Sequence, residues 1–194
     1  MIKKAVFFDR DGTLIPDSHY LNNVEGVVLM PGVAEALQDL QKDFLLIVIS
    51  NQSGVGRGYF TCEVVHAQNG KLKHLFEAEK VHLSGVYFCP HVSEDSCECR
   101  KPRPGMLYKA ALDLGIDLNH SYVVGDKDSD INAGKAAGCR TVLLSSEPCH
   151  DADFTTQNMR DVANWILFDV GDHSVACQKS SAKKRNSIEP LSSE

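Results

Sequence analysis

Short apolar runs, each followed by a stretch with helical spacing, restrict the fold of this sequence more than any other feature. Few polar residues interrupt the runs, which is typical of strands covered on both faces. Alternation of such strands with helices predicts a three-layer, doubly wound α/β fold around a parallel sheet. The expected strands are Ala5–Phe8, Phe44–Ile49, Val86–Phe88, Tyr122–Val124 and Thr141–Leu144. The expected helices follow Pro31, Thr61 and Pro104, with two more over residues 129–138 and 162–168.

The alternating pattern ends near Gly171, and this divides the chain of 194 residues into two parts. Residues 1–170 are long enough for one domain with a sizeable core. Residues 171–194 are polar and nearly free of large apolar side chains, so we expect a disordered tail. Its basic triplet Lys183–Arg185 allows a targeting patch as the alternative, but a solvated tail is favoured.

Charge and hydropathy exclude several classes of partner. The net charge is −6 and the pI is near 5.7, which disfavours a nucleic-acid backbone as partner. No apolar run is long enough to span a bilayer, and Asp9 interrupts the first run before it could serve as a signal peptide. We therefore expect a cytoplasmic monomer that acts on a small molecule, without nucleic acid or membrane partners.

Carboxylates follow two of the expected strands. Asp9 and Asp11 come directly after the first strand, and Asp126 follows the fourth. Ligands of open α/β sheets bind beyond the carboxyl ends of the strands, so these side chains are expected at one rim. Closely spaced carboxylates repel each other unless a cation intervenes, and oxygen ligands of this kind suit Mg²⁺. The sequence predicts a catalytic Mg²⁺ at Asp9, Asp11 and Asp126.

The same rim favours phosphate hydrolysis. One aspartate would attack phosphorus to form an aspartyl-phosphate while the other handles protons. Gly12 would let the main chain approach the phosphate, and Ser50 and Lys101 would bind its oxygens. Taken alone, Asp9–Thr13 reads equally well as an acidic turn after a strand.

Four potential metal ligands lie within eleven residues of one loop. They follow the pattern C-x-H-x5-C-x-C at Cys89, His91, Cys97 and Cys99. Three thiolates and one imidazole form a closed set for structural zinc, which would order a loop that has little apolar content. Chance clustering of thiols is the alternative.

The loop that holds these four residues is short, as is the segment between Leu14 and Pro31. Neither is long enough for a cap domain, so the site is expected to be open and capless.

Four motifs occur in order, each at a strand end or a helix start: DRDGT at 9–13, SNQ at 50–52, Lys101, and GDKxxD at 125–130. In this set the chain resembles the haloacid-dehalogenase (HAD) superfamily of phosphatases, from about Val6 to Trp165. The resemblance implies that Asp9 is the nucleophile and that Asp11 is the general acid and then the base. It also implies that Ser50 and Lys101 steady the phosphoryl group. Mg²⁺ would be held by Asp9, the main-chain carbonyl of Asp11, and Asp126.

Within the superfamily the chain is similar to the heptose 1,7-bisphosphate 7-phosphatases and to the histidinol-phosphate phosphatases, which carry a zinc loop of this type. The zinc loop has the shorter, histidinol-like length. Ser53 stands where the histidinol pattern has an aspartate, which favours removal of the 7-phosphate of D-glycero-D-manno-heptose 1,7-bisphosphate, in heptose precursor synthesis for cell-surface polysaccharide. Arg57 and Arg100 are cations available to the remote phosphate. The likeness implies that the remaining substrate contacts are Asp17, Ser18, His19, Tyr20, Asn51, Gln52, Ser53 and Lys127.

Two other classes of function are disfavoured. A dinucleotide-binding oxidoreductase needs G-x-G-x-x-G, but Tyr59 occupies the place of the third glycine after Gly54 and Gly56. A phospho-receiver would also use an aspartate, a hydroxyl, a lysine and Mg²⁺. It needs no second acid beside the acceptor, however, whereas Asp11 follows two residues after Asp9.

Overall fold

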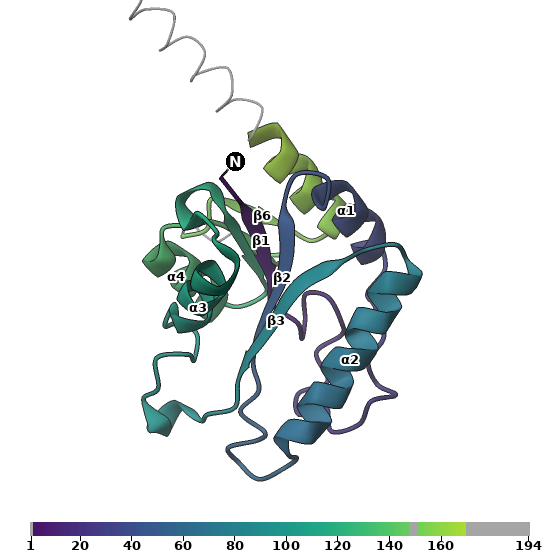
Figure 1. Cartoon of the computed structure of the whole chain (residues 1–194), viewed down its shortest axis with the longest axis vertical. Coiled ribbons are helices and arrows are strands. Elements are labelled where there is room, and N and C mark those ends of the chain that lie inside the picture. Colours follow the sequence, from purple (N-terminus) through teal and green to yellow (C-terminus); the bar gives the residue numbers. More distant parts are fainter. Residues whose placement is uncertain (1, 148–150, 170–194) are drawn as a thin grey trace, which may run out of the picture.

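A computed structural model describes residues 2–147 and 151–169, which form a six-stranded, fully parallel sheet between two layers of helices (Figure 1). None of the helices in these ranges has the length and apolar character that a membrane crossing requires. The strands are β1 (Ala5–Phe8), β2 (Leu45–Asn51), β3 (Leu83–Cys89), β4 (Tyr122–Gly125), β5 (Arg140–Leu144) and β6 (Phe154–Thr156). The α-helices are α1 (Val33–Leu40), α2 (Cys62–Ala78), α3 (Gly105–Leu114), α4 (Asp128–Ala137) and a last one over residues 159–169.

The strand order is β3-β2-β1-β4-β5-β6, so the chain reverses its direction of travel across the sheet at β1. β1 pairs with β2 on one side and with β4 on the other, although β4 comes much later in the sequence. The crevice beyond the carboxyl ends of strands at such a switch point is where open α/β sheets bind ligands. The residues after β1 and β4 therefore lie at the position expected for a site.

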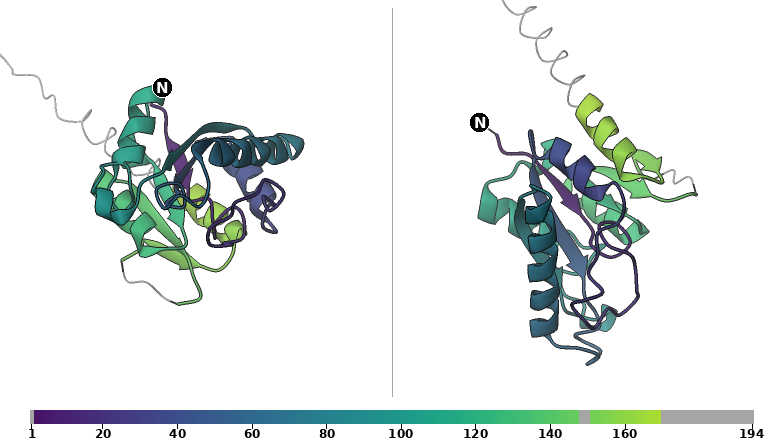
Figure 2. Two further views of the ribbon diagram at one scale, coloured as in Figure 1. Left: turned by 90° about the horizontal axis from the view of Figure 1, so that it is seen from below. Right: turned by 90° about the vertical axis from the view of Figure 1, so that its right-hand side faces the viewer.

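Side chains of β1 alternate between the two faces of the sheet, and each face has its own core. Val6 and Phe8 belong to the core beneath α1, α2 and the helix over residues 159–169. Ala5 and Phe7 belong to the core beneath α3 and α4. Figures 1 and 2 show these two helical layers on opposite sides of the sheet. The doubly wound α/β architecture predicted from the apolar runs is confirmed.

The structure adds one strand and leaves no room for a cap domain in the described residues. β6 was not predicted, because its three residues are all half-buried and show no alternation. Between β1 and α1 the chain forms only turns and isolated bridges, and between β3 and α3 it forms only a 3-10 turn over Ser93–Asp95. The expected open, capless rim agrees with this arrangement. The predicted tail over 171–194 lies outside the described residues.

Candidate active site

Three carboxylates meet at the switch point. Asp9 follows β1 and its N–H donates to the carbonyl of Val124 in β4 at 2.9 Å, so β4 fixes its main chain. Asp126 follows β4, and Asp130 lies on the first turn of α4. One carboxylate oxygen from each of the three lies within 4.8 Å of the others. Asp130 is the member that the sequence placed in a motif but did not predict as part of the metal group.

Lys101 supplies the cation of this group. Its Nζ lies 2.6 Å from Oδ1 of Asp9 and 2.6 Å from Oδ1 of Asp130, and it donates to the carbonyl of Ile49 at 2.9 Å. Asn51, at the end of β2, holds the main chain of Lys101 from both sides. Its Nδ2 donates to the Lys101 carbonyl at 3.0 Å, and its Oδ1 accepts from the Lys101 N–H at 3.1 Å. Asn51 therefore positions the lysine.

The carboxylates of the site outnumber its cations. Lys101 pairs with Asp9 and Asp130, and Nζ of Lys127 lies 3.8 Å from Oδ2 of Asp126. Burial works to lower the pKa of Lys101, but Asp9 and Asp130 outweigh it and raise that pKa, so the lysine stays charged. Burial raises the pKa of Asp9 to about 7, against the opposing effect of Lys101 and with the help of Asp130. Burial also raises the pKa of Asp126. A divalent cation would offset this excess of negative charge.

The residues present fit Mg²⁺. Among the described residues, Oδ1 of Asp126 is buried and has no hydrogen-bond partner, which a metal ligand would explain. Gly12 has φ +90°, and a Cβ at this position would lie 2.3 Å from Oδ2 of Asp126. Only glycine leaves room for the Asp126 carboxylate. Asp9 and Asp126 therefore agree with the predicted ligand set.

The side chain of Asp11 does not belong to this carboxylate group. It turns toward Arg10, whose Nε and Nη2 donate to Oδ2 and Oδ1 at 3.1 and 3.2 Å. Oδ2 also accepts from Nε2 of Gln52 at 2.8 Å and from Oγ of Ser50 at 3.4 Å. If Asp11 contributes to a metal site, its main-chain carbonyl is the group available, as the family resemblance implies.

A cavity of about 320 Å³ is lined by Asp11, Gln52 and Lys101, among other residues. Most of the predicted substrate contacts line it, but the side chains of Ser18 and Arg57 do not. Asp9, Ser50 and Asp126 are not among its lining residues. The lining residues are Asp11, Asp17, His19, Tyr20, Asn51, Gln52, Ser53, Gly54, Phe60, Arg100, Lys101, Lys127 and Ser129.

Two contacts cross the mouth of the cavity. Nζ of Lys127 donates to Oδ2 of Asp17 at 2.9 Å. The ring of Tyr20 meets that of Tyr59 edge to face, with centroids 4.8 Å apart. Both contacts attach the loop after β1, one to the start of α4 and the other to the loop that follows β2. Side-chain pairs thus connect segments around an opening that no cap covers within residues 2–147 and 151–169.

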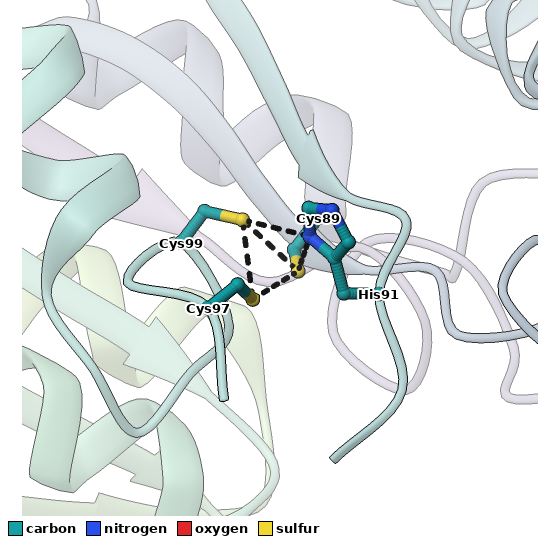
Figure 3. Close-up of side chains that lie close together, drawn as sticks. All are labelled: Cys89, His91, Cys97 and Cys99. Atoms are coloured by element: carbon teal, nitrogen blue, oxygen red, sulfur yellow. Dashed lines mark hydrogen bonds between the residues drawn. The ribbon is translucent and has the colours of Figure 1, made fainter. Parts of the chain in front are cut away.

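The predicted zinc ligands converge on one point (Figure 3). Sulfur–sulfur distances among Cys89, Cys97 and Cys99 are 3.2 to 3.6 Å, and Nδ1 of His91 lies 3.5 and 3.3 Å from Cys89 and Cys99. Tetrahedral zinc with Zn–S bonds of about 2.3 Å separates sulfurs by about 3.8 Å, so the group is close to what this metal needs. Burial, assisted by Cys99, raises the pKa of the Cys89 thiol, so its thiolate needs a cation.

Main-chain carbonyls of the zinc loop hold two arginines. The carbonyl of His91 accepts from Nη1 of Arg100 at 3.2 Å, and that of Cys97 accepts from Nη1 of Arg103 at 2.7 Å. Both arginines line a second cavity, of about 420 Å³, which shares Arg100 and Lys101 with the first. The loop therefore orients cations next to the carboxylate site.

Comparison with known proteins agrees with this geometry. The HAD-hydrolase-like family matches residues 98–167. A D-glycero-beta-D-manno-heptose-1,7-bisphosphate 7-phosphatase of Haemophilus ducreyi is 43% identical over 181 residues, which cover 86% of this chain and 100% of that protein. The enzyme of the same name from Escherichia coli K12 is 35% identical over 185 residues, with 90% and 94% covered.

The chain belongs to this phosphatase family of the HAD superfamily. Among solved structures, the D,D-heptose 1,7-bisphosphate phosphatase of B. bronchiseptica, in complex with magnesium and phosphate, matches with a TM-score of 0.76 at 27% identity. The match covers 86% of this chain and 99% of that one. Membership confirms the superfamily, the fold and the class of enzyme, a phosphoric monoester hydrolase, that the four motifs predicted.

Sequence reasoning missed the buried residues that support Asp11. Arg10 lies between two acids, where an exposed turn residue is usual. Gln68 and Asn69 lie in an ordinary helical pattern, which gives no sign that they are buried acceptors. The available signal was the alternation of β1, which carries Arg10 to the same face as Phe8, beneath α2.

Proposed function

We propose that this chain is a Mg²⁺-dependent phosphatase that removes the 7-phosphate of D-glycero-D-manno-heptose 1,7-bisphosphate through an aspartyl-phosphate on Asp9. The observation that carries this proposal is the group of Asp9, Asp126 and Asp130 at the switch point of the sheet, with Lys101 bound to Asp9 and Asp130. Asp11 stands beside the group and lines the cavity above it. Asp9 is thus available as the nucleophile, and Asp11, two positions later, is available as the separate acid.

Each residue has a distinct task in the reaction. A carboxylate oxygen of Asp9 forms a bond to phosphorus while the bond to the sugar oxygen breaks, and Asp11 gives that oxygen its proton. Asp11, now a carboxylate, takes a proton from water as the water oxygen attacks phosphorus. The bond to Asp9 breaks and inorganic phosphate leaves. Lys101 stays charged throughout and stabilises the phosphoryl oxygens with Ser50.

Mg²⁺ bound by Asp9, Asp126 and the main-chain carbonyl of Asp11 would neutralise phosphate charge and orient phosphorus toward Asp9. Zinc at Cys89, His91, Cys97 and Cys99 would order the loop that carries Arg100 and Lys101. The closed ligand set leaves this zinc no open position for chemistry. The two metals would therefore have separate roles.

Arg100 is the cation we assign to the remote phosphate, since it lines the cavity with Lys101. Arg57 lies outside the lining, so its part in binding stays a prediction. We further propose that residues 1–170 are the whole catalytic domain, and that the protein acts in the cytoplasm as a monomer.

Activity measurements on the purified protein test the proposal. In Mg²⁺, the catalytic efficiency should be higher with the heptose 1,7-bisphosphate than with histidinol phosphate, and the product should retain the 1-phosphate. Asp9→Asn should abolish turnover and keep the fold, because an amide cannot form the acyl phosphate. Asp128→Asn, on the exposed side of α4, is the matched control and should keep full activity. A clear preference for histidinol phosphate, or near-native turnover by Asp9→Asn, would refute the assignment.

A further inference from the structure

Arg10 is a buried cation that the proposed reaction does not use. It is among the largest fully buried side chains of the molecule, with 1% of its surface exposed. A buried guanidinium is costly unless every donor finds a partner, so its contacts indicate what it is for. Those contacts divide into two groups, one at the active site and one in α2.

The first group is a forked pair with Asp11. Nε donates to Oδ2 at 3.1 Å and Nη2 donates to Oδ1 at 3.2 Å. The planar guanidinium matches both oxygens of a carboxylate, so such a pair fixes the carboxylate plane as well as its position. Adjacent residues of the chain form the pair, and Arg10 must therefore be anchored elsewhere to act as a support.

The second group provides this anchor. Nη1 of Arg10 donates to Oε1 of Gln68 and to Oδ1 of Asn69, both at 3.1 Å. Gln68 is fully buried and Asn69 is 7% exposed, although both lie on a helix face that otherwise packs apolar side chains. Nε2 of Gln68 donates in turn to the carbonyl of Leu21 at 2.8 Å. The orientation of Arg10 is thus set by α2 and by the loop after β1.

The two oxygens of Asp11 differ as a result. Oδ2 accepts from Arg10, Gln52 and Ser50, whereas Oδ1 accepts from Arg10 alone among the described residues. A carboxylate oxygen with three donors has little capacity left for a proton. Oδ1, with one donor, therefore has more capacity left to carry a proton than Oδ2 has.

We propose that Arg10, held by Gln68 and Asn69, is a positioning residue that orients Asp11 for proton transfer through Oδ1. This inference rests on the proposed function, in which Asp11 is the general acid. It predicts a defect that depends on the leaving group. A sugar alkoxide needs a proton to leave, whereas 4-nitrophenolate leaves readily without one, so a misplaced acid should impair only the first substrate.

The test measures kcat/KM separately for the heptose bisphosphate and for 4-nitrophenyl phosphate. For each substrate, kcat/KM reports the steps up to and including phosphoryl transfer to Asp9. Asn69→Leu removes one acceptor of Arg10, and Arg10→Lys keeps the charge but removes the fork. Both variants should lower kcat/KM for the sugar bisphosphate by about tenfold or more, which is a part of the 100- to 10,000-fold effect typical of general acids. They should change kcat/KM for the aryl phosphate by less than about threefold. Asn69→Asp keeps the acceptor and should restore the sugar value.

Asp11→Asn, measured alongside, separates the two hypotheses. If it shows the leaving-group-dependent loss but neither Asn69→Leu nor Arg10→Lys does, Asp11 is the acid and the positioning role of Arg10 is wrong. If kcat/KM falls equally for both substrates in the Arg10 and Asn69 variants, these residues support the fold and do not position Asp11. If Asp11→Asn itself shows no selective loss, the acid role fails and the inference fails with it. Thermal melting of each variant confirms that folded protein is compared.

Discussion

Nζ of Lys127 donates a 2.9 Å hydrogen bond to Oδ2 of Asp17, and this contact joins the start of α4 to the loop after β1 across the active-site cavity. Partial burial works to raise the pKa of Asp17, but hydrogen bonds from Lys127 and from the N–H of His19 outweigh it and lower the pKa. A lowered carboxylate pKa means that the stabilisation is present at neutral pH and is lost only on acidification. The pair is thus intact when substrate arrives.

Removal of this pair should impair catalysis more than stability. A partly exposed ion pair contributes roughly 0.2–1 kcal/mol to folding. A charged hydrogen bond to a substrate contributes roughly 1.5–3 kcal/mol, or about tenfold to a hundredfold in efficiency. We expect Lys127→Ala to lower kcat/KM by about tenfold and to leave Tm nearly unchanged, whereas Lys135→Ala in the last turn of α4 should change neither. A fall in Tm without a fall in kcat/KM would contradict this expectation.

Gly12 should be irreplaceable for a reason specific to the metal site. Gly12→Ala would place a Cβ 2.3 Å from Oδ2 of Asp126 and would force that carboxylate to move, so the Mg²⁺ concentration for half-maximal activity should rise at least about tenfold. Gly115→Ala is the matched control. It also has positive φ, but nothing lies within 4 Å of its added Cβ. Both changes should cost about 1–2 kcal/mol of stability. Equal Mg²⁺ requirements in the two variants would exclude a crowded Asp126.

The cysteine cluster should be needed for structure and not for the chemical step. Cys97→Ser removes one of four ligands, so metal analysis should find less zinc, and Tm should fall because the loop loses its support. Cys62→Ser, outside the cluster at the start of α2, should retain zinc and Tm. KM should rise in Cys97→Ser, since the Cys97 and His91 carbonyls hold Arg103 and Arg100. Full stability of a protein that never contained zinc would rule out the structural site.

Arg100 should discriminate between substrates with two phosphates and those with one. Arg100→Ala should reduce kcat/KM for the sugar bisphosphate by about tenfold to a hundredfold and affect a small monophosphate much less. Arg103→Ala tests whether the zinc loop itself has loosened, because Arg103 is also bound to a loop carbonyl but lines only the second cavity. Similar losses with both substrates in Arg100→Ala would place the arginine at the reacting phosphate.

Strand ends could be predicted from the sequence because polar residues follow apolar runs abruptly there. Asp9 and Asp126 were placed at one rim for that reason, and Lys101 because it precedes an expected helix. The structure brings the three together. The position of Ser18 and Arg57 could not be predicted, because loop side chains have no periodicity to fix their direction. Both were expected at the substrate, and neither lines the cavity.

The acceptors of Arg10 in α2 were beyond sequence reasoning for a different cause. A buried polar network is specified by three-dimensional partners, and Gln68 lies 58 positions from Arg10. On a helix, glutamine and asparagine are read as exposed, since both residue types are mostly found at the surface. Only the packing of α2 over the end of β1 turns them into acceptors for a buried arginine.

The pairing of β1 with β4 has a consequence for how activity appears during folding. Ala5 donates to Oγ of Ser121, 116 positions away, and Phe8 lies beside Val124. Contacts between such distant segments form late, because the intervening loop must be closed first. Asp9 and Asp126 cannot meet before this step. We therefore expect a nascent chain that ends before Tyr122 to be inactive toward phosphate esters. After dilution from denaturant, the rate at which turnover recovers should report the rate at which β1 pairs with β4.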